Sequence, residues 1–278
     1  MYKKCFIAGL PSAGKTTFLA ALWNLINHDS DAKLKLNKIE NGQYLASLSN
    51  KWANMEPLER TVPSGEQANI SIKLELPNKT TFDLQLPDLS GETFQSQYEM
   101  REISEEVMKY IEDANAVLFF INVNSIKLLG LISEQTLLRS STPTTNNDIV
   151  NRNPKEDDPI QIQVIELLQF ILFIRKNKML KIGFMFSAWD LIKSNLNDIK
   201  PEQFLEKQMN MLWQFCQSND DIIKYQTWGI SAQGCSFNEK DLLLDKEYPY
   251  ERIFVEGNGG YQGCDLTLPL YLLMGDMK

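Results

Sequence analysis

Residues 9–16 of this chain read Gly9-Leu10-Pro11-Ser12-Ala13-Gly14-Lys15-Thr16 and match the pattern G-x-x-x-x-G-K-[ST] at every fixed position. Residues 4–8 before it form a short, mostly apolar segment of the kind that makes a buried strand. Residues 16–23 after it are rich in apolar helix formers. A strand, a turn framed by glycines and the start of a helix are the context in which this pattern binds phosphate. An ordinary glycine-containing turn before a helix is the alternative, and the matching flanks make it the rarer case.

The expected chemistry of this loop follows from its residue types. Glycines let the backbone wrap closely around phosphate oxygens, and successive N–H groups and the positive end of the helix then face the anion. We expect Lys15 to reach the outer phosphates and the Thr16 hydroxyl to bind Mg²⁺. The expected phosphate-binding residues are Gly9, Ser12, Ala13, Gly14, Lys15, Thr16 and Thr17.

Composition excludes several classes of protein. The chain has 278 residues, of which 43% are hydrophobic, and a net charge of −8. The acidic balance argues against non-specific nucleic-acid binding and against adhesion to anionic membranes. We expect no membrane span, because the longest apolar run, residues 160–174, is short and interrupted by polar residues. The four cysteines have no paired spacing, and no signal peptide is evident, so we expect a reduced cytoplasmic protein without a zinc site.

The order of expected elements predicts one α/β domain over residues 1–278. Expected strands cover residues 4–8, 70–76, 82–86, 116–123, 181–186 and 225–230. Expected helices cover residues 16–28, 43–55, 104–110, 160–175, 201–216 and a short stretch near 269–273. Residues 70–76 and 82–86 alternate around a turn and predict a hairpin, the one antiparallel element of a parallel sheet. Insertions are expected at about 29–67, 124–159 and 234–263, the last with a small hairpin around 258–260.

Three further patterns follow the phosphate loop in chain order. Asp88-Leu89-Ser90-Gly91 ends the hairpin as D-x-x-G, where the Asp can hold Mg²⁺ and the Gly91 N–H can sense a γ-phosphate. Ser187-Ala188-Trp189-Asp190 ends one expected strand and Ser231-Ala232-Gln233 ends the next. For Asp190 alone, a helix N-cap is the alternative interpretation.

This ordered set resembles the Ras-like, translation-factor-related (TRAFAC) class of P-loop GTPases, in which [N/T]-K-x-D and S-A-[K/x] form the base site. The resemblance implies that Asp190 pairs with the ring N–H and amino group of guanine. It also implies that Ser231 and Ala232 form the last motif, with the Ala232 N–H facing the guanine carbonyl.

The chain departs from this class at two positions of the base site. Ser187 stands where Asn or Thr is usual, and Ala188 stands where Lys is usual. Because the Lys stem normally covers one face of the base and Ala188 is too short to do so, Trp189 or Gln233 is the candidate for that cover. Guanine preference then rests mainly on Asp190.

The resemblance also implies residues for switching and catalysis. The loop before the hairpin should carry a Thr that closes on Mg²⁺ and the γ-phosphate; Thr61 is our choice and Ser64 is the rival. Glu92 follows Gly91 where many relatives carry a water-orienting Gln, and a surface helix residue is the alternative. Arg60, next to Thr61, is a candidate internal arginine finger.

Within the class, the chain is most similar to the prokaryotic double-GTPases of bacterial conflict, or antiviral defence, systems. The shared features are Gly-Leu-Pro-Ser-Ala-Gly-Lys-Thr-Thr-Phe-Leu, a long segment before the hairpin, Asp-Leu-Ser-Gly-Glu, the Trp-Asp base motif and a closing Pro-Leu helix. The resemblance implies a three-layer P-loop NTPase sandwich with a mostly parallel six-stranded sheet. It further implies GTP or GDP and Mg²⁺ as cofactors, slow hydrolysis in a molecular switch, and an effector or oligomer partner.

Two other functions remain open from the sequence. The altered base motif is compatible with an ATPase or a nucleotide kinase that shares the phosphate loop. A nucleotide-binding scaffold without turnover, which docks a partner or oligomerises through its insertions, is the second alternative.

Overall fold

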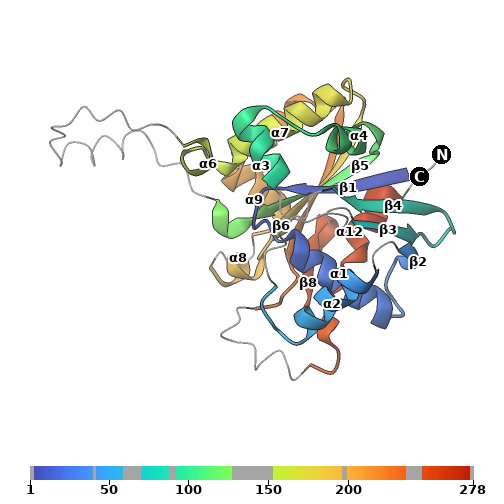
Figure 1. Ribbon diagram of the computed structural model, residues 1–278. Helices are drawn as coiled ribbons and strands as arrows, with labels where there is room; N and C mark the ends of the chain where they lie inside the picture. The colour runs from blue at the N-terminus through green and yellow to red at the C-terminus, as the bar shows by residue number, and fades with distance from the viewer. Residues whose placement is uncertain are drawn as a thin grey trace.

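The computed structural model describes residues 3–39, 42–58, 70–87, 92–126, 153–195, 199–235 and 246–275. In these residues a nine-stranded sheet of order β2-β3-β4-β1-β5-β6-β7-β8-β9 lies between two helical layers (Figure 1). The strands are β1 (Lys3–Gly9), β2 (Lys35–Ile39), β3 (Ile70–Glu75), β4 (Thr81–Leu86), β5 (Ala116–Asn122), β6 (Leu180–Ser187), β7 (Ile223–Ser231), β8 (Phe254–Gly257) and β9 (Tyr261–Gly263).

The centre of the sheet is parallel. Strand β1 pairs with β4 on one side and with β5 on the other, and β5, β6 and β7 continue in the same direction. Strand β3 runs antiparallel to β4, so the predicted hairpin is confirmed. The α/β fold with a mostly parallel sheet is therefore the one that the sequence predicts.

The sheet is wider than the six strands expected from the sequence. Strand β2 adds to β3, β8 adds to β7 and β9 adds to β8, all antiparallel. Strand β2 shows no buried alternation because its lysines and Asn37 face solvent, and β8 and β9 are very short. The small hairpin expected around residues 258–260 is confirmed, since η5 (Asn258–Gly260) joins β8 to β9.

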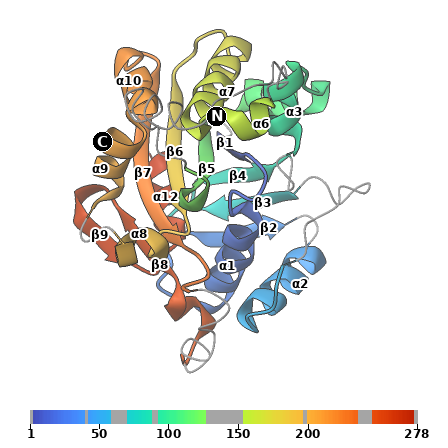
Figure 2. The same cartoon turned by 90° about the vertical axis from the view of Figure 1, so that its left-hand side faces the viewer.

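Helices cover both faces of the sheet, and the two views agree on their sides (Figures 1 and 2). One face carries α1 (Lys15–His28), α2 (Gly42–Ala53) and α12 (Thr267–Met274). The other carries α3 (Glu92–Met100), α4 (Glu105–Asp113), α7 (Ile160–Ile174), α9 (Pro201–Gln208) and α10 (Asn210–Ser218). The single helix expected over residues 201–216 is two helices, because Met209 leaves the helical conformation with φ −126° and ψ 47°.

The central strands are apolar on both faces because each face is covered by helices. In β5, alternate residues enter the two cores: Ala116, Leu118 and Phe120 on the α1 side, and Val117, Phe119 and Ile121 on the α7 side. The carboxyl ends of β1, β5, β6 and β7 meet at one edge of the sheet, which is where ligands bind in open α/β sheets.

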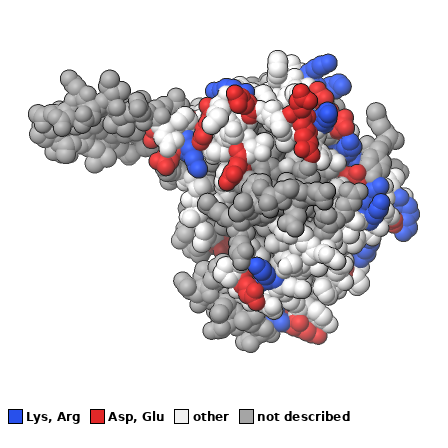
Figure 3. All heavy atoms as spheres, viewed as in Figure 1, with Lys and Arg blue, Asp and Glu red and all other residues white. Residues whose placement is uncertain are grey.

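The surface carries charges of both signs. On the face seen in Figure 3, acidic and basic side chains lie interspersed over α3, α4 and the short α6 (Pro154–Asp157). Among the helices of the described ranges, none combines the length and apolarity that crossing a membrane requires.

Candidate nucleotide-binding site

The phosphate loop joins β1 to α1 and needs its two framing glycines. Gly9 has φ 149°, and a Cβ there would lie 2.7 Å from the Phe120 carbonyl oxygen. Gly14 has φ 90° and begins α1 as its N-cap, and a Cβ there would lie 2.9 Å from Cβ of Ser187. The loop therefore lies against the ends of β5 and β6, and both positions exclude any larger residue.

Lys15 lies over this loop. Its side chain is 3% exposed, and Nζ donates to the carbonyl oxygens of Gly9 at 2.8 Å and of Leu10 at 3.0 Å. Thr16 and Thr17 follow in the first turn of α1. Because Gly14 offers no capping side chain, the first-turn N–H groups are suited to an anion such as phosphate.

Two strand ends hold the loop by side-chain hydrogen bonds. Ser187, at the end of β6, donates from Oγ to the Ala13 carbonyl at 2.8 Å. Asn122, at the end of β5, donates from Nδ2 to the Ser12 carbonyl at 3.0 Å. Ser187 thus links the base-side motif to the phosphate loop. Its side chain is shorter than that of Asn, which suits the small separation between Gly14 and the end of β6. Sequence analysis missed Asn122, whose signal is a polar residue ending an apolar strand.

The two base-side motifs touch each other. Asp190 begins the short helix α8 (Asp190–Asn195), and its Oδ1 accepts a hydrogen bond from Ser231 Oγ at 2.5 Å. The same Ser231 oxygen accepts from the Gly234 N–H at 3.2 Å. Ala188 has φ 57°, a left-handed conformation that turns the chain between β6 and α8. The Asp190 carboxylate is thereby held by the adjacent strand.

A cavity of about 610 Å³ lies between the phosphate loop and these motifs. Its volume is in the range of small-molecule sites. It is lined by Ser12, Gly14, Thr17, Pro57, Leu58, Asn122, Asn124, Ser187, Ala188, Asp190, Leu191, Ser231, Ala232, Gln233 and Cys235. Pro57 and Leu58, which lie within the insertion expected at about 29–67, add apolar surface to this wall.

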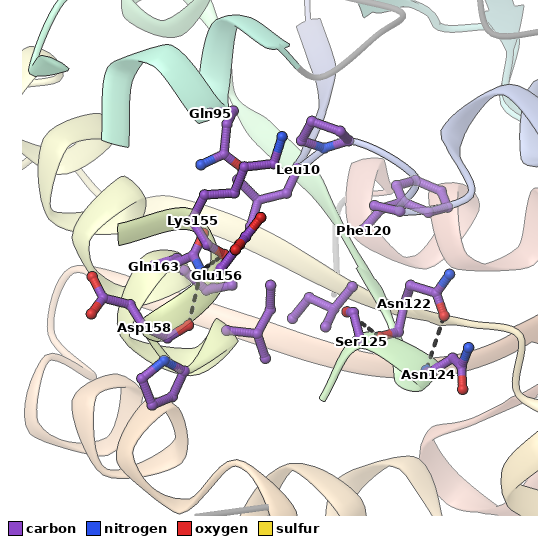
Figure 4. A pocket seen from close by; sticks show the side chains of 16 residues that line it. Leu10, Gln95, Phe120, Asn122, Asn124, Ser125, Lys155, Glu156, Asp158 and Gln163 are labelled. Atoms are coloured by element: carbon purple, nitrogen blue, oxygen red, sulfur yellow. Dashed lines mark hydrogen bonds between the residues drawn. The ribbon is translucent and has the colours of Figure 1, made fainter. Parts of the chain in front are cut away.

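A second cavity, of about 350 Å³, lies on the other side of the phosphate loop (Figure 4). Leu10 of the loop, Gln95 of α3 and Lys155 of α6 are among its lining residues, and Asn122 lines both cavities. In Figure 4, Lys155 extends from α6 towards Leu10 and Gln95. The phosphate loop is therefore the wall between the two hollows.

Several sequence-predicted residues lie elsewhere. Glu92 is exposed at the start of α3 and lines a separate open hollow with Thr93, Ser96 and Glu102. Trp189 is fully buried and does not line the 610 Å³ cavity, whereas Gln233 does. Five candidates lie outside the described residues: Arg60, Thr61, Ser64, Asp88 and Gly91.

Comparison with solved structures finds GTPases at low identity. The signal recognition particle receptor SRb–GTP/SRX complex from Chaetomium thermophilum is 11% identical, with 84% of this chain and 91% of that chain covered and a TM-score of 0.40. The S. cerevisiae Ski7 GTPase-like domain, bound to GDP and inorganic phosphate, is 16% identical, with 100% and 51% covered and a TM-score of 0.44. No curated protein matches the chain.

The family is established by a match of another kind. The model of the family described as Double-GTPase 1 matches residues 6–273. Because that match spans nearly the whole chain, including the phosphate loop and both base-side motifs, the chain belongs to the Double-GTPase 1 family and is a GTP-binding GTPase.

Proposed function

We propose that the protein is a Mg²⁺-dependent GTP hydrolase that works as a molecular switch. The observation that carries this proposal is the convergence of the phosphate loop, Asp190 and Ser231 on one cavity of about 610 Å³. The phosphate loop supplies backbone N–H groups for the phosphates, and the opposite end of the cavity supplies a carboxylate for the base.

Guanine suits this cavity better than adenine. A carboxylate at Asp190 accepts from the ring N–H and the amino group of guanine, and the Ala232 N–H donates to its carbonyl oxygen. Adenine carries an amino group where guanine has that carbonyl, so it would place a donor against a donor and leave the carboxylate unmatched. The hydrogen bond from Ser231 supports the role of Asp190 because it fixes one carboxylate oxygen.

The phosphate end suits a triphosphate with Mg²⁺. Lys15 lies within the loop and would turn from the Gly9 and Leu10 carbonyls to the outer phosphates. The Thr16 hydroxyl follows directly on Lys15 and is the hard oxygen ligand that Mg²⁺ prefers. Thr16, Asp88 and Thr61 would hold the ion, which when bound neutralises charge on the phosphate oxygens.

For the chemical step we propose Arg60 as an internal arginine finger and Glu92 as the residue that orients the attacking water. Since Glu92 lines a separate hollow, its role requires the start of α3 to turn towards the phosphate loop when GTP binds. That rearrangement would keep turnover slow until a partner favours it. Arg60→Ala should slow single-turnover hydrolysis with little loss of GTP affinity; an unchanged rate contradicts the assignment.

The wider role follows the family resemblance. We propose that the protein acts in the cytoplasm of a prokaryotic cell, beside an effector partner in a defence system. None of the four cysteines forms a disulfide, which suits a reducing compartment. The insertions at about 124–159 and 234–263 are the proposed docking surfaces, because loops carry variable function.

The proposed function is tested by phosphate release from GTP and from ATP, each with Mg²⁺ and with excess chelator. We expect release from GTP that needs Mg²⁺, little from ATP, and none above background from Lys15→Ala. Lys4→Ala is the matched control, because Lys4 lies on β1, the strand that leads into the phosphate loop, is partly exposed and pairs with Asp113. Equal release from ATP, or no release from GTP, would overturn the proposal in favour of an ATPase or a scaffold.

A further inference from the structure

Two buried tryptophans are tied to the base-side motifs: Trp189 belongs to one of them, and Trp52 bonds to the other. Trp189 directly precedes Asp190, and its Nε1 donates to Glu256 Oε2 at 2.8 Å. Trp52 lies on α2, and its Nε1 donates to the Ala232 carbonyl at 3.1 Å. Neither indole lines the nucleotide cavity, so neither touches the base. Each can act only through the residue that it holds.

Glu256 of β8 bonds to residues on both sides of Asp190 in the chain. Besides the Trp189 indole, it accepts a hydrogen bond from Lys193 Nζ at 2.9 Å, and Lys193 lies three residues after Asp190 on α8. Gln262 of β9 donates to the same carboxylate at 2.9 Å. Glu256 is therefore the common partner of the residues that flank Asp190.

Burial and bonding make Glu256 a rigid anchor. The residue is 3% exposed. Burial by itself would raise the pKa of its carboxyl, but hydrogen bonds from Lys193, Gln262 and Trp189, together with the Lys193 charge, hold that pKa below its ordinary value. The group is therefore ionised at neutral pH, and a buried carboxylate with three donors has little freedom to move.

The Trp189 ring is closely packed on several sides. It packs on Gly229 of β7, where a Cβ would lie 2.4 Å from the indole. Its other neighbours include the rings of Phe186 and Phe204, with centroids 6.1 Å and 5.3 Å away. The hydrogen bond and this packing together fix where the chain leaves β6 and hence where Asp190 begins.

Trp52 is anchored to the same part of the chain. Arg252, two residues before β8, donates to the carbonyl oxygens of Trp52 and Ala53, the latter at 3.1 Å. Its guanidinium lies 4.1 Å from the centre of the Trp52 ring. Because Arg252 is buried, this contact is shielded from water and holds the end of α2 firmly. Residues 252–257 therefore anchor both tryptophans.

We propose that Trp189 and Trp52 are positioning residues that set nucleotide specificity, braced by Glu256 and Arg252. Trp189 aims the Asp190 carboxylate at the amino side of the base, and Trp52 aims the Ala232 N–H at its carbonyl. The inference rests on the proposed guanine site and adds the residues that give it its selectivity.

The two tryptophans should affect different parts of the base. Inosine diphosphate differs from GDP only in lacking the amino group, and ADP lacks the carbonyl as well. Trp189→Phe should lower the preference for GDP over inosine diphosphate about tenfold, the size expected for a hydrogen bond to a charged group. Trp52→Phe should leave that preference unchanged and lower the preference for both over ADP.

The experiment is a calorimetric titration of the full chain with GDP, inosine diphosphate and ADP. Trp228→Phe is the matched control, because Trp228 is buried and packs on Gly257 of β8, but its indole donates at 3.3 Å to Gln226 rather than to Glu256 or Ala232. It should lose stability with both preferences intact. A control that changes the preferences as Trp189→Phe does, or a Trp189→Phe protein with wild-type preferences, would overturn the inference.

A second pair of variants covers the case in which Trp189→Phe does not fold. Glu256→Gln keeps an acceptor oxygen for the indole and should retain most of the preference for GDP over inosine diphosphate, whereas Glu256→Leu should lose it. Equal preferences in the two variants would overturn the inference. A wild-type protein that binds GDP and ADP alike would instead remove the proposed guanine site itself, so the two failures are distinguishable.

Discussion

Ser187→Ala removes one oxygen from the junction between the two ends of the site. Ser187 Oγ donates to the Ala13 carbonyl at 2.8 Å, and both residues are buried, at 8% and 4% exposed. The Cβ atom remains, so the close contact with Gly14 is unchanged. The variant leaves the Ala13 carbonyl without this donor, which costs about 1–3 kcal/mol. Because the lost bond joins the base loop to the phosphate loop, we expect GDP to bind about tenfold more weakly, or ~1.4 kcal/mol.

The assay combines GDP titration with urea unfolding of the nucleotide-free protein. Ser49→Ala is the control, because Ser49 is a buried serine that accepts from Asn24 Nδ2 at 3.4 Å between α2 and α1. It should lower the free energy of unfolding with GDP affinity kept within about twofold, well under the tenfold step of 1.4 kcal/mol. If Ser187→Ala loses stability but binds GDP as the wild type does, the bond has no part in holding the nucleotide site.

Three further predictions follow from the base side. Asp190→Asn should weaken GDP at least about tenfold and favour xanthosine diphosphate, whose second carbonyl accepts from the new amide; competition titration measures this, and unchanged GDP affinity would contradict it. Gly229→Ala should lower the free energy of unfolding by about 1–3 kcal/mol, because its Cβ would meet the Trp189 indole at 2.4 Å; an unchanged urea midpoint would refute that clash. Since the pKa of Glu256 is lowered in the native protein, its stabilisation should be complete above the ordinary glutamate pKa and lost as the pH falls through the lowered one. The melting temperature should therefore fall less steeply between pH 7 and acid pH in Glu256→Gln than in the wild type. Parallel falls in the two proteins would show that Glu256 does not contribute to the pH dependence.

The sequence predicted the centre of the fold because its signals there are local. The glycines of the phosphate loop, the alternation of β3 and β4, and the apolar run of β5 each follow from neighbouring residues. Strand β2 escaped prediction because its side chains are mostly exposed and only pairing with β3 makes it a strand. The break at Met209 likewise depends on tertiary packing, since that residue is fully buried.

The same difference separates the predicted from the unpredicted parts of the site. Lys15, Asp190 and Ser231 belong to contiguous motifs that can be read from the sequence. The bond from Trp189 to Glu256 joins residues 67 positions apart, and the bond from Trp52 to Ala232 spans 180 positions. No sequence pattern around Glu256 indicates a hydrogen bond to a distant tryptophan, so only the folded structure shows it.

The cavity should select guanine although Ala188 stands where lysine is usual. Displacement of a fluorescent guanine nucleotide by GTP and by ATP, in the wild type and in Asp190→Ala, measures this selectivity. We predict displacement by GTP at far lower concentration than by ATP, and a much smaller difference between the two in Asp190→Ala. Equal displacement by GTP and ATP in the wild type would show that the cavity does not select guanine.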